Sequence, residues 1–332
     1  MPVLEPRHDL AHPVEADTAW SESYYFNGFD PGTDSGLFTR IGIRPNEGTM
    51  DAGMSVWLPG GELAEFRQVK DQSEMVDTVL EVGAVRFEML EALRSWRITM
   101  DAEVPARPCT AGAQASRPVR LSLDVRFDAL TPAIGTDGRS RGGPRSAQAA
   151  AAAGTVGRGH LEQAGRWTGW LEVDGVRHSW TGAYGNRDRS WGPRRWGGPK
   201  MWRWFSINLG EKMHFGGIRL GTDAGDLHRG WVWDGGRATS IAEWRLRTEL
   251  ADDGVTHEVV HLEVADKEAR TYDLRGDVLR VADIGKPGGT VVNEGLARWT
   301  YRAPGGGELT GYGICEYLHQ LDDSGRPVVD VD

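Results

Sequence analysis

Residues whose chemistry could serve a binding or catalytic site gather between positions 178 and 194, where the sequence reads HSWTGAYGNRDRSWGPR. A loop of this polar and aromatic composition usually borders a site. Asp188 stands between Arg187 and Arg189, and guanidinium groups that bind a carboxylate keep it ionised by lowering its pKa. We therefore expect Asp188 to stabilise positive charge or to order a water molecule, with the two arginines as catalytic partners. Tyr184 is the better candidate for exchanging a proton.

Aromatic and basic residues around this motif are candidate ligand-binding residues. Trp191 and Arg194 lie at its end, and Trp202 and Trp204 follow shortly after. Indole rings can line an apolar pocket or stabilise a cationic transition state. The same tryptophans can also be core residues, because strand alternation places Trp202 and Trp204 on one face. Likewise, the Arg–Asp pattern could form a buried ion-pair network that joins two barrels.

The segment His257-Glu258-Val259-Val260-His261 matches the H-E-x-x-H pattern of zinc proteases, whose two histidines share one face of a helix. Here β-branched residues follow a turn at Asp253-Gly254, which favours a strand with Glu258 on one face and both histidines on the other. We therefore predict no metal at this segment. No glycine cluster has nucleotide-binding spacing between a strand and a helix, and no G-x-S-x-G elbow occurs, so we predict no cofactor.

Composition narrows the class of protein. The chain has 332 residues, a formal net charge of −10 and ordinary globular proportions of 39% hydrophobic and 26% charged residues. The acidic balance disfavours nucleic acid as a partner, and no apolar run reaches the roughly 18 residues of a membrane span. Residues 1–20 lack the apolar stretch of a secretory signal, so we expect a cytoplasmic protein. Cys109 and Cys315 have no metal-type spacing, and we expect packing thiols.

Alternation of apolar and polar residues is the clearest local signal in the chain. In residues 119–127, VRLSLDVRF, every second side chain is apolar, which predicts a half-buried strand. Further segments with this period lie at 37–45, 93–100, 202–209, 244–250 and 296–302. Gly, Pro, Asn and Asp separate them, as expected for antiparallel neighbours. The sequence therefore predicts an all-β protein.

Turn residues and composition divide the chain further. Asp174-Gly175 separates two alternating segments, as expected for a tight hairpin in which Gly tolerates positive φ. We predict no helix in the Ala run at 149–153, which has no polar and apolar faces. Residues 132–159, rich in Gly, Ala, Ser and Arg, are predicted to form a flexible insertion, either a solvated loop or a lid. The length of the chain favours two domains, which we place at 15–180 and 181–322.

Several motifs, taken in order, resemble the AttH and carotenoid 1,2-hydratase (hydroxyneurosporene synthase) superfamily. The matching segments are YYFNGFDP (24–31), GLFTRIGIRPNEG (36–48), FDALTP (127–132), GNRDRSWGPR (185–194) and MWRWFSINLG (201–210). The resemblance covers most of the chain, from about residue 18 to 320. It implies two lipocalin-like antiparallel barrels packed together around an apolar cavity.

The resemblance also implies an activity. The superfamily includes hydratases that protonate an isolated double bond without a cofactor, and related folds cyclise hydrophobic polyketides. In the hydratase branch the pattern His-Asp-His-x-Trp-Gly falls on residues 187–192. Asp188, Trp191 and Gly192 agree with it, whereas Arg187 and Arg189 replace both histidines. Because arginine does not give up its proton at ordinary pH, this chain departs from the chemistry of that branch.

Together these observations predict a cofactor-independent hydratase, isomerase or cyclase that acts on a hydrophobic terpenoid, steroid-like or polyketide small molecule. The alternative is a non-catalytic carrier of a lipophilic ligand, and a third possibility is a structural module whose motif only joins the domains. A buried titratable group that touches a cavity would favour the enzyme. A wholly apolar cavity would favour the carrier, and a filled interior the structural module.

Overall fold

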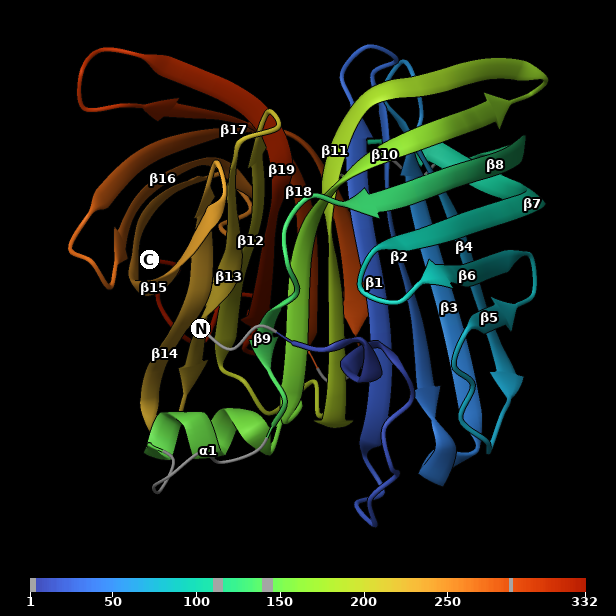
Figure 1. Ribbon diagram of the computed structural model, residues 1–332, viewed down its shortest axis with the longest axis horizontal. Coiled ribbons are helices and arrows are strands. Elements are labelled where there is room, and N and C mark those ends of the chain that lie inside the picture. Colours follow the sequence, from blue (N-terminus) through green and yellow to red (C-terminus); the bar gives the residue numbers. More distant parts are fainter. Residues whose placement is uncertain (1–3, 110–115, 139–145, 287–288) are drawn as a thin grey trace. The chain divides into compact units, whose positions relative to one another are not determined.

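The computed structural model describes residues 4–109, 116–138, 146–286 and 289–332, and the chain is almost entirely strand (Figure 1). Strand accounts for 68% of the structure and helix for 4%, which confirms the all-β prediction. The chain divides into two compact units. The N-terminal unit comprises residues 2–139 and 157–194, and the C-terminal unit comprises residues 140–156 and 195–332.

The N-terminal unit is built on one antiparallel sheet of eleven strands, ordered β4-β3-β2-β1-β11-β10-β8-β7-β6-β5, with β9 paired to β10. A further pairing between β4 and β7 curls the sheet back on itself. Two short 3₁₀ helices, η1 (Pro6–Asp9) and η2 (Pro45–Glu47), belong to the same unit. Its strands are β1 (Trp20–Asp30), β2 (Ser35–Arg44), β3 (Thr49–Trp57), β4 (Glu62–Asp71), β5 (Val79–Val82), β6 (Val85–Glu91), β7 (Ser95–Pro108), β8 (Arg117–Ala129), β9 (Ile134–Thr136), β10 (Gly159–Val173) and β11 (Val176–Pro193).

The C-terminal unit contains a closed barrel of eight antiparallel strands in sequence order, β12 to β19. One helix, α1 (Ala147–Ala153), belongs to this unit and contacts β13 and β14. The barrel strands are β12 (Met201–Leu209), β13 (Met213–Thr222), β14 (Gly225–Asp234), β15 (Arg237–Leu250), β16 (His257–Asp266), β17 (Thr271–Lys286), β18 (Thr290–Arg302) and β19 (Glu308–Gln320).

Each segment predicted from alternation coincides with a strand over most of its length, although 37–45 ends one residue beyond β2 and 93–100 begins two residues before β7. The clearest example is β8, where Val119, Leu121, Leu123, Val125 and Phe127 are all buried. They belong to the hydrophobic core of the N-terminal unit. The apolar face of β8 therefore packs inward because burial of that face is what stabilises the strand. The hairpin at Asp174-Gly175 is also confirmed: the two residues join β10 to β11 with φ of +50° and +82°.

Aromatic side chains fill the interiors of both units. In the N-terminal unit Phe26 packs against Trp96 and Trp167, with ring centroids 5.6 and 6.0 Å away. In the barrel Phe205 packs against Trp244 and Trp299, at 5.1 and 6.1 Å. Edge-to-face and tilted arrangements of this kind are the favourable ones for aromatic pairs. Most of the tryptophans are thus core residues.

The Ala run differs from its prediction. Residues 149–153 lie in α1, whose first turn is capped by Ser146, because its Oγ accepts a hydrogen bond from the backbone N–H of Ala149 at 3.2 Å. Alanine has the highest helix propensity, and the cap satisfies one of the free N–H groups at the helix start. The prediction of no helix was therefore wrong, since it weighed amphipathicity and not propensity.

The predicted insertion at 132–159 contains regular elements, and the predicted domain boundary lies within a strand. Part of 132–159 lies outside the described residues, at 139–145. The described part contains β9, α1 and the first residue of β10. The predicted boundary between residues 180 and 181 falls inside β11, which continues to Pro193, and the division between the units lies at Arg194–Arg195. Residues 184–193 of β11 pair with β1, and residues 183–191 pair with β10, which keeps this part of the strand in the N-terminal unit.

Candidate functional site

The central motif lies on a strand and not in a loop. Residues 178–193 belong to β11, which pairs with β1 on one side and with β10 on the other. The Gly192-Pro193 pair ends this strand, and Gly192 has φ of +114°. Because side chains alternate along a strand, the odd-numbered residues from 187 to 191 share one face and Asp188 lies on the other.

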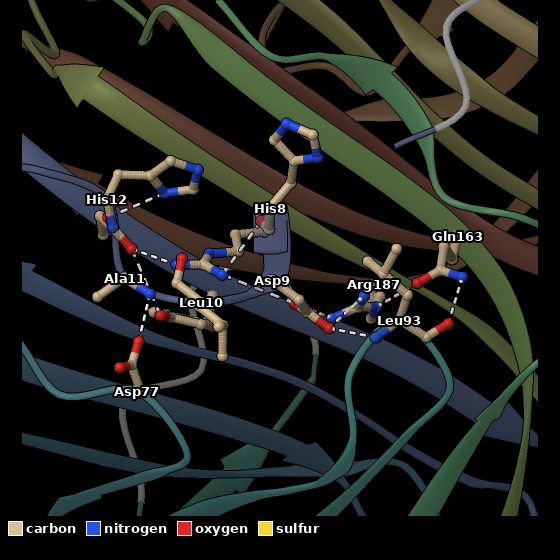
Figure 2. A network of polar contacts seen from close by, with 12 residues as sticks. His8, Asp9, Leu10, Ala11, His12, Asp77, Leu93, Gln163 and Arg187 are labelled. Carbon is tan, nitrogen blue, oxygen red and sulfur yellow. Dashed lines mark hydrogen bonds and ion pairs between the residues drawn. The ribbon is translucent and has the colours of Figure 1, made fainter. Parts of the chain in front are cut away.

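Arg187 and Arg189 bind carboxylates other than Asp188, so the predicted Arg–Asp network was wrong. Arg187 forms a paired interaction with Asp9, from Nη1 to Oδ1 at 2.8 Å and from Nη2 to Oδ2 at 2.9 Å (Figure 2). Its Nε donates to Oε1 of Gln163 at 2.8 Å. Arg189 donates to a carboxylate oxygen of Glu22 and lies over the ring of Tyr24 at 4.3 Å. Both guanidinium groups are buried.

This buried network holds its carboxylates in the charged form. Burial alone would raise the pKa of Asp9, but Arg187 and Arg189 outweigh it, and the pKa of Asp9 is lowered. The pKa of Glu22 is lowered in the same way, against burial, by Arg189 and His12. The two arginines therefore belong to a buried ion-pair network, as in the structural alternative for this motif. Its carboxylates are Asp9 and Glu22, whereas the sequence predicted Asp188.

Asp188 belongs to a second cluster, with His160 and Glu162 of β10. Glu162 is the direct cross-strand neighbour of Asp188, and His160 lies two residues away on the same face. His160 Nε2 contacts Oδ2 of Asp188 and lies 3.7 Å from Oε1 of Glu162. The three groups each offer an atom within 4.8 Å of the others. Glu162 is buried, whereas the side chain of Asp188 is 17% exposed and that of His160 is 37% exposed.

The charge balance of this cluster favours a protonated imidazole. Burial opposes a charge on His160, and so does Arg194, but Asp188 and Glu162 outweigh both and raise the pKa of His160 to about 9. At neutral pH His160 is therefore protonated beside Asp188 and Glu162, so it carries a proton that it can donate, and the cluster can orient a water molecule. One imidazole nitrogen and two carboxylate oxygens are also a donor set that suits a divalent cation.

Tyr184 lies on the same face of β11 as Asp188 but four residues away, about 13 Å along a strand. Arg166 Nη2 donates to its hydroxyl at 3.5 Å, and the guanidinium lies 5.7 Å from its ring. Tyr184 is thus part of a separate Arg–Tyr contact. The structure does not bring it within hydrogen-bond reach of Asp188.

The predicted ligand-binding residues do not form one site, because they lie in different parts of the structure. Trp191 shares the face of Arg189 and stacks on His12, with ring centroids 3.8 Å apart. Arg194 follows β11, close enough to His160 to affect its pKa. Trp202 and Trp204 lie on one face of β12 in the C-terminal unit, as alternation predicted, and Trp202 Nε1 donates to Oε1 of Glu316 at 2.5 Å.

Sequence reasoning missed His160, Glu162, Asp9 and Glu22. His160 and Glu162 carry a local signal, because two titratable residues at i and i+2 share one face of a strand. Their proximity to Asp188 depends on the β10–β11 register, which local sequence does not specify. Asp9 lies far from Arg187 along the chain, and only the fold brings the two together.

The H-E-x-x-H segment lies on β16, which confirms the predicted strand. His257 is inside the barrel: its Nε2 donates to the carbonyl oxygen of Cys315 at 3.0 Å, and burial lowers its pKa to about 3. His261 instead contacts Glu249 at 2.8 Å and is partly exposed. His257 stacks on the core residue Tyr317, and a register shift between β15 and β16 separates it from His261. The prediction that both histidines share a face was therefore wrong.

The fold and the site together define an all-β protein of lipocalin-like units with titratable clusters on a central strand. The chain belongs to the family described as a domain of unknown function (DUF7064), whose model matches residues 5–321. No helix in the described part of the chain has the length and hydropathy that a bilayer span requires.

Solved structures of other proteins share the fold. A protein provisionally named AttH from Nitrosomonas europaea is 17% identical, with a TM-score of 0.64, over 96% of this chain and 97% of that chain. Kievitone hydratase from Nectria haematococca is 14% identical, with a TM-score of 0.59, over 96% of this chain and 93% of that chain. These similarities confirm, at the level of fold, the resemblance predicted from the sequence motifs. A comparison with curated proteins gives no significant match.

Proposed function

We propose that the protein is a cofactor-independent enzyme that protonates a double bond in a hydrophobic terpenoid, steroid-like or polyketide small molecule. Hydration, isomerisation and cyclisation can all begin with that step. The observation that carries the proposal is the geometry of the His160–Glu162–Asp188 cluster, in which Asp188 contacts Nε2 of His160 and Glu162 lies 3.7 Å from it at a partly exposed position. The two acidic side chains raise the pKa of His160 to about 9. A fold shared with a hydratase supports hydration as the first reaction to test.

In the proposed hydration, His160 gives its proton to one carbon of the double bond. Water adds to the other carbon, which carries the developing positive charge. Asp188 accepts a proton from that water and returns it to His160, so that the net change is the addition of one water molecule. Glu162 and Asp188 also stabilise the cationic intermediate by their negative charge.

The filled interiors argue against a carrier that would hold its ligand inside a barrel. The centre of each unit is occupied by fully buried aromatic side chains, Trp96 and Trp167 in one and Trp244 and Trp299 in the other. The filled interior that would favour a structural module is thus observed, but it accompanies a titratable cluster with a raised pKa at an accessible position. That combination favours an enzyme whose chemistry lies outside the barrel interiors.

The test begins with mass spectrometry of small molecules that co-purify with the protein. Compounds of the identified class are then incubated with it in H₂¹⁸O, and incorporation of ¹⁸O is followed. His160→Gln and Asp188→Asn should each lower turnover by about 10²-fold or more, which is the scale for losing an acid–base group. His261→Gln, which disrupts a histidine–carboxylate pair between β16 and β15, is the matched control and should retain full turnover.

Three outcomes would contradict the proposal. The first is a ligand that is bound and released unchanged, which would indicate a carrier. The second is unchanged turnover in both cluster variants. The third is activity that chelators remove and a divalent cation restores, because the cluster would then act as a metal site and not as a proton donor.

A further inference from the structure

The N-terminal unit contains a carboxylate-binding arrangement that its own chain occupies. We call residues 4–12 the N-terminal segment. Asp9 in this segment is fully buried, although it is charged and lies in a short 3₁₀ helix near the start of the chain. A buried charge requires dedicated partners, and Figure 2 shows two of them, Arg187 and Leu93, in contact with Asp9.

The partners of Asp9 are those with which proteins bind free carboxylates. Arg187 supplies two parallel N–H groups, and the backbone N–H of Leu93 donates to Oδ2 at 2.7 Å. A second guanidinium is nearby, because Arg189 Nη1 lies 3.7 Å from Oδ1. A planar fork, a backbone amide and an additional positive charge thus converge on one carboxylate from strands and a turn that do not belong to the N-terminal segment.

Arg189 also has a donor that the segment does not use. Arg189 Nη2 donates to the carbonyl oxygen of Leu10 at 2.6 Å and to Glu22, and Nη1 donates to the carbonyl oxygen of His8 at 3.3 Å. Its buried Nε has no hydrogen-bond partner among the residues that the structure describes. An unsatisfied buried donor is costly, and the segment does not supply an acceptor for this atom.

Space opens beside this arrangement. A cavity of about 310 Å³ is bordered by Leu4 and Pro6 of the N-terminal segment and by Leu93 and Gln163. Leu93 is the residue whose amide binds Asp9, and Gln163 is the residue that accepts from Arg187 Nε. One residue that binds Asp9 and one that binds Arg187 therefore border this cavity, while the two guanidinium groups lie behind them and are buried.

We propose that Arg187, Arg189 and the amide of Leu93 form a binding site for a small carboxylate, and that Asp9 is its built-in occupant. When the Asp9 carboxylate is absent, formate or acetate takes its place. The site uses the face of β11 opposite to Asp188, so the proposal goes beyond the proposed function and does not depend on it.

The test removes the occupant and supplies a substitute. Asp9→Ala removes a carboxylate that neutralises two buried guanidinium groups. The melting temperature of this variant should therefore be about 10 °C lower than that of the native protein. Sodium formate should then raise the melting temperature in a saturable way, by at least half of the loss, whereas sodium chloride at equal ionic strength should not. Binding of ¹³C-formate, followed by NMR, should saturate over the same concentration range.

Two variants serve as matched controls. Asp9→Asn fills the site with a neutral amide, so it should be destabilised and not rescued. In Asp9→Ala/Arg187→Met the fork is gone, and formate should have no more effect than chloride. Equal effects of formate and chloride on Asp9→Ala, or equal rescue of the double variant, would overturn the proposal.

Should Asp9→Ala fail to fold in ordinary buffer, it is refolded in formate and in chloride. Folding in formate alone supports the site. Folding in neither contradicts it, because a free carboxylate would then be unable to occupy the position of Asp9.

Discussion

At the scale of residues, neighbours on β11 have opposite roles because they lie on opposite faces. Arg187 and Arg189 neutralise Asp9 and Glu22 within the N-terminal unit. Asp188, between them in the sequence, contacts His160 and stands opposite Glu162. Charge attraction between sequence neighbours is therefore a poor guide on a strand, where alternate side chains point apart and cross-strand residues are the true neighbours.

The electrostatic account of His160 gives a prediction that needs no substrate. Asp188→Asn removes a carboxylate that helps to raise the pKa of His160 to about 9, so this pKa should fall toward its ordinary value of about 6.5. Proton–nitrogen NMR of the imidazole follows the titration directly. Asp188→Glu keeps the charge and should keep most of the elevation. An unchanged titration in Asp188→Asn would show that Asp188 is not the partner of the imidazolium.

The same raised pKa makes His160 contribute to stability in a defined pH range. The folded-state pKa of about 9 exceeds the ordinary value of 6.5, so the contribution is complete below about pH 6.5 and is lost as pH rises through 9. The melting temperature of the native protein should therefore decline between pH 7 and 9.5. His160→Gln should start lower and decline less over that interval. Parallel curves for the two proteins would contradict the assignment.

At the scale of elements, the fit of β1 against the core is close. Trp167 of β10 donates from Nε1 to the carbonyl oxygen of Asn27 at 2.8 Å, and its ring lies against Gly28. A Cβ on Gly28 would lie 2.5 Å from Trp167 Nε1, closer than atoms can approach. Gly28 is thus the residue that allows a tryptophan to pack across the β1 backbone, beside the strand that carries the candidate site.

This fit predicts different effects for two strand glycines. Gly28→Ala should lower the free energy of unfolding by about 1–3 kcal/mol, because the added methyl group overpacks a site next to the buried Trp167. Gly53→Ala on β3 is the matched control, since nothing lies within 4 Å of its Cβ position, and it should be neutral or slightly stabilising. Urea unfolding of both variants measures the difference. Equal effects would contradict the close contact between Gly28 and the Trp167 ring.

At the scale of the whole molecule, carboxylates paired with buried arginines connect stability to pH at the acidic end. The pKa values of Asp9 and Glu22 are lowered from ordinary values of 3.8 and 4.5. Their stabilising contribution is therefore present above about pH 4.5 and is lost as pH falls through the lowered values. Asp9 lies in the N-terminal segment and binds Arg187 of β11. Its protonation therefore weakens a contact between parts of the chain that are far apart in the sequence.

Acid unfolding tests this account. The melting temperature of the native protein should fall steeply below about pH 4. Asp9→Asn should be less stable by about 3–5 kcal/mol at pH 7, since a guanidinium loses its partner. Its decline between pH 5 and 3 should be shallower than that of the native protein, because one titrating carboxylate is missing. A steeper decline in the variant would show that other carboxylates dominate the acid response.

The sequence by itself determined the class of fold and about half of the strands that the structure describes. Period-2 alternation in segments such as 119–127, together with the Asp174-Gly175 turn, carries that information because strand burial and hairpin geometry are set by nearby residues. Helix α1 was missed because its signal is the propensity of alanine and a Ser146 cap, which alternation does not register.

Only the tertiary structure decided which charged residues meet. Asp188 and the two arginines were recognised from the sequence, but their partners were not. The β10–β11 register brings His160 to Asp188, and the path of the N-terminal segment brings Asp9 to Arg187. Likewise, a bulge beside β16 separates His257 from His261. Strand register and chain path arise from packing of the whole sheet, so charge pairing across strands is a global property that local patterns do not contain.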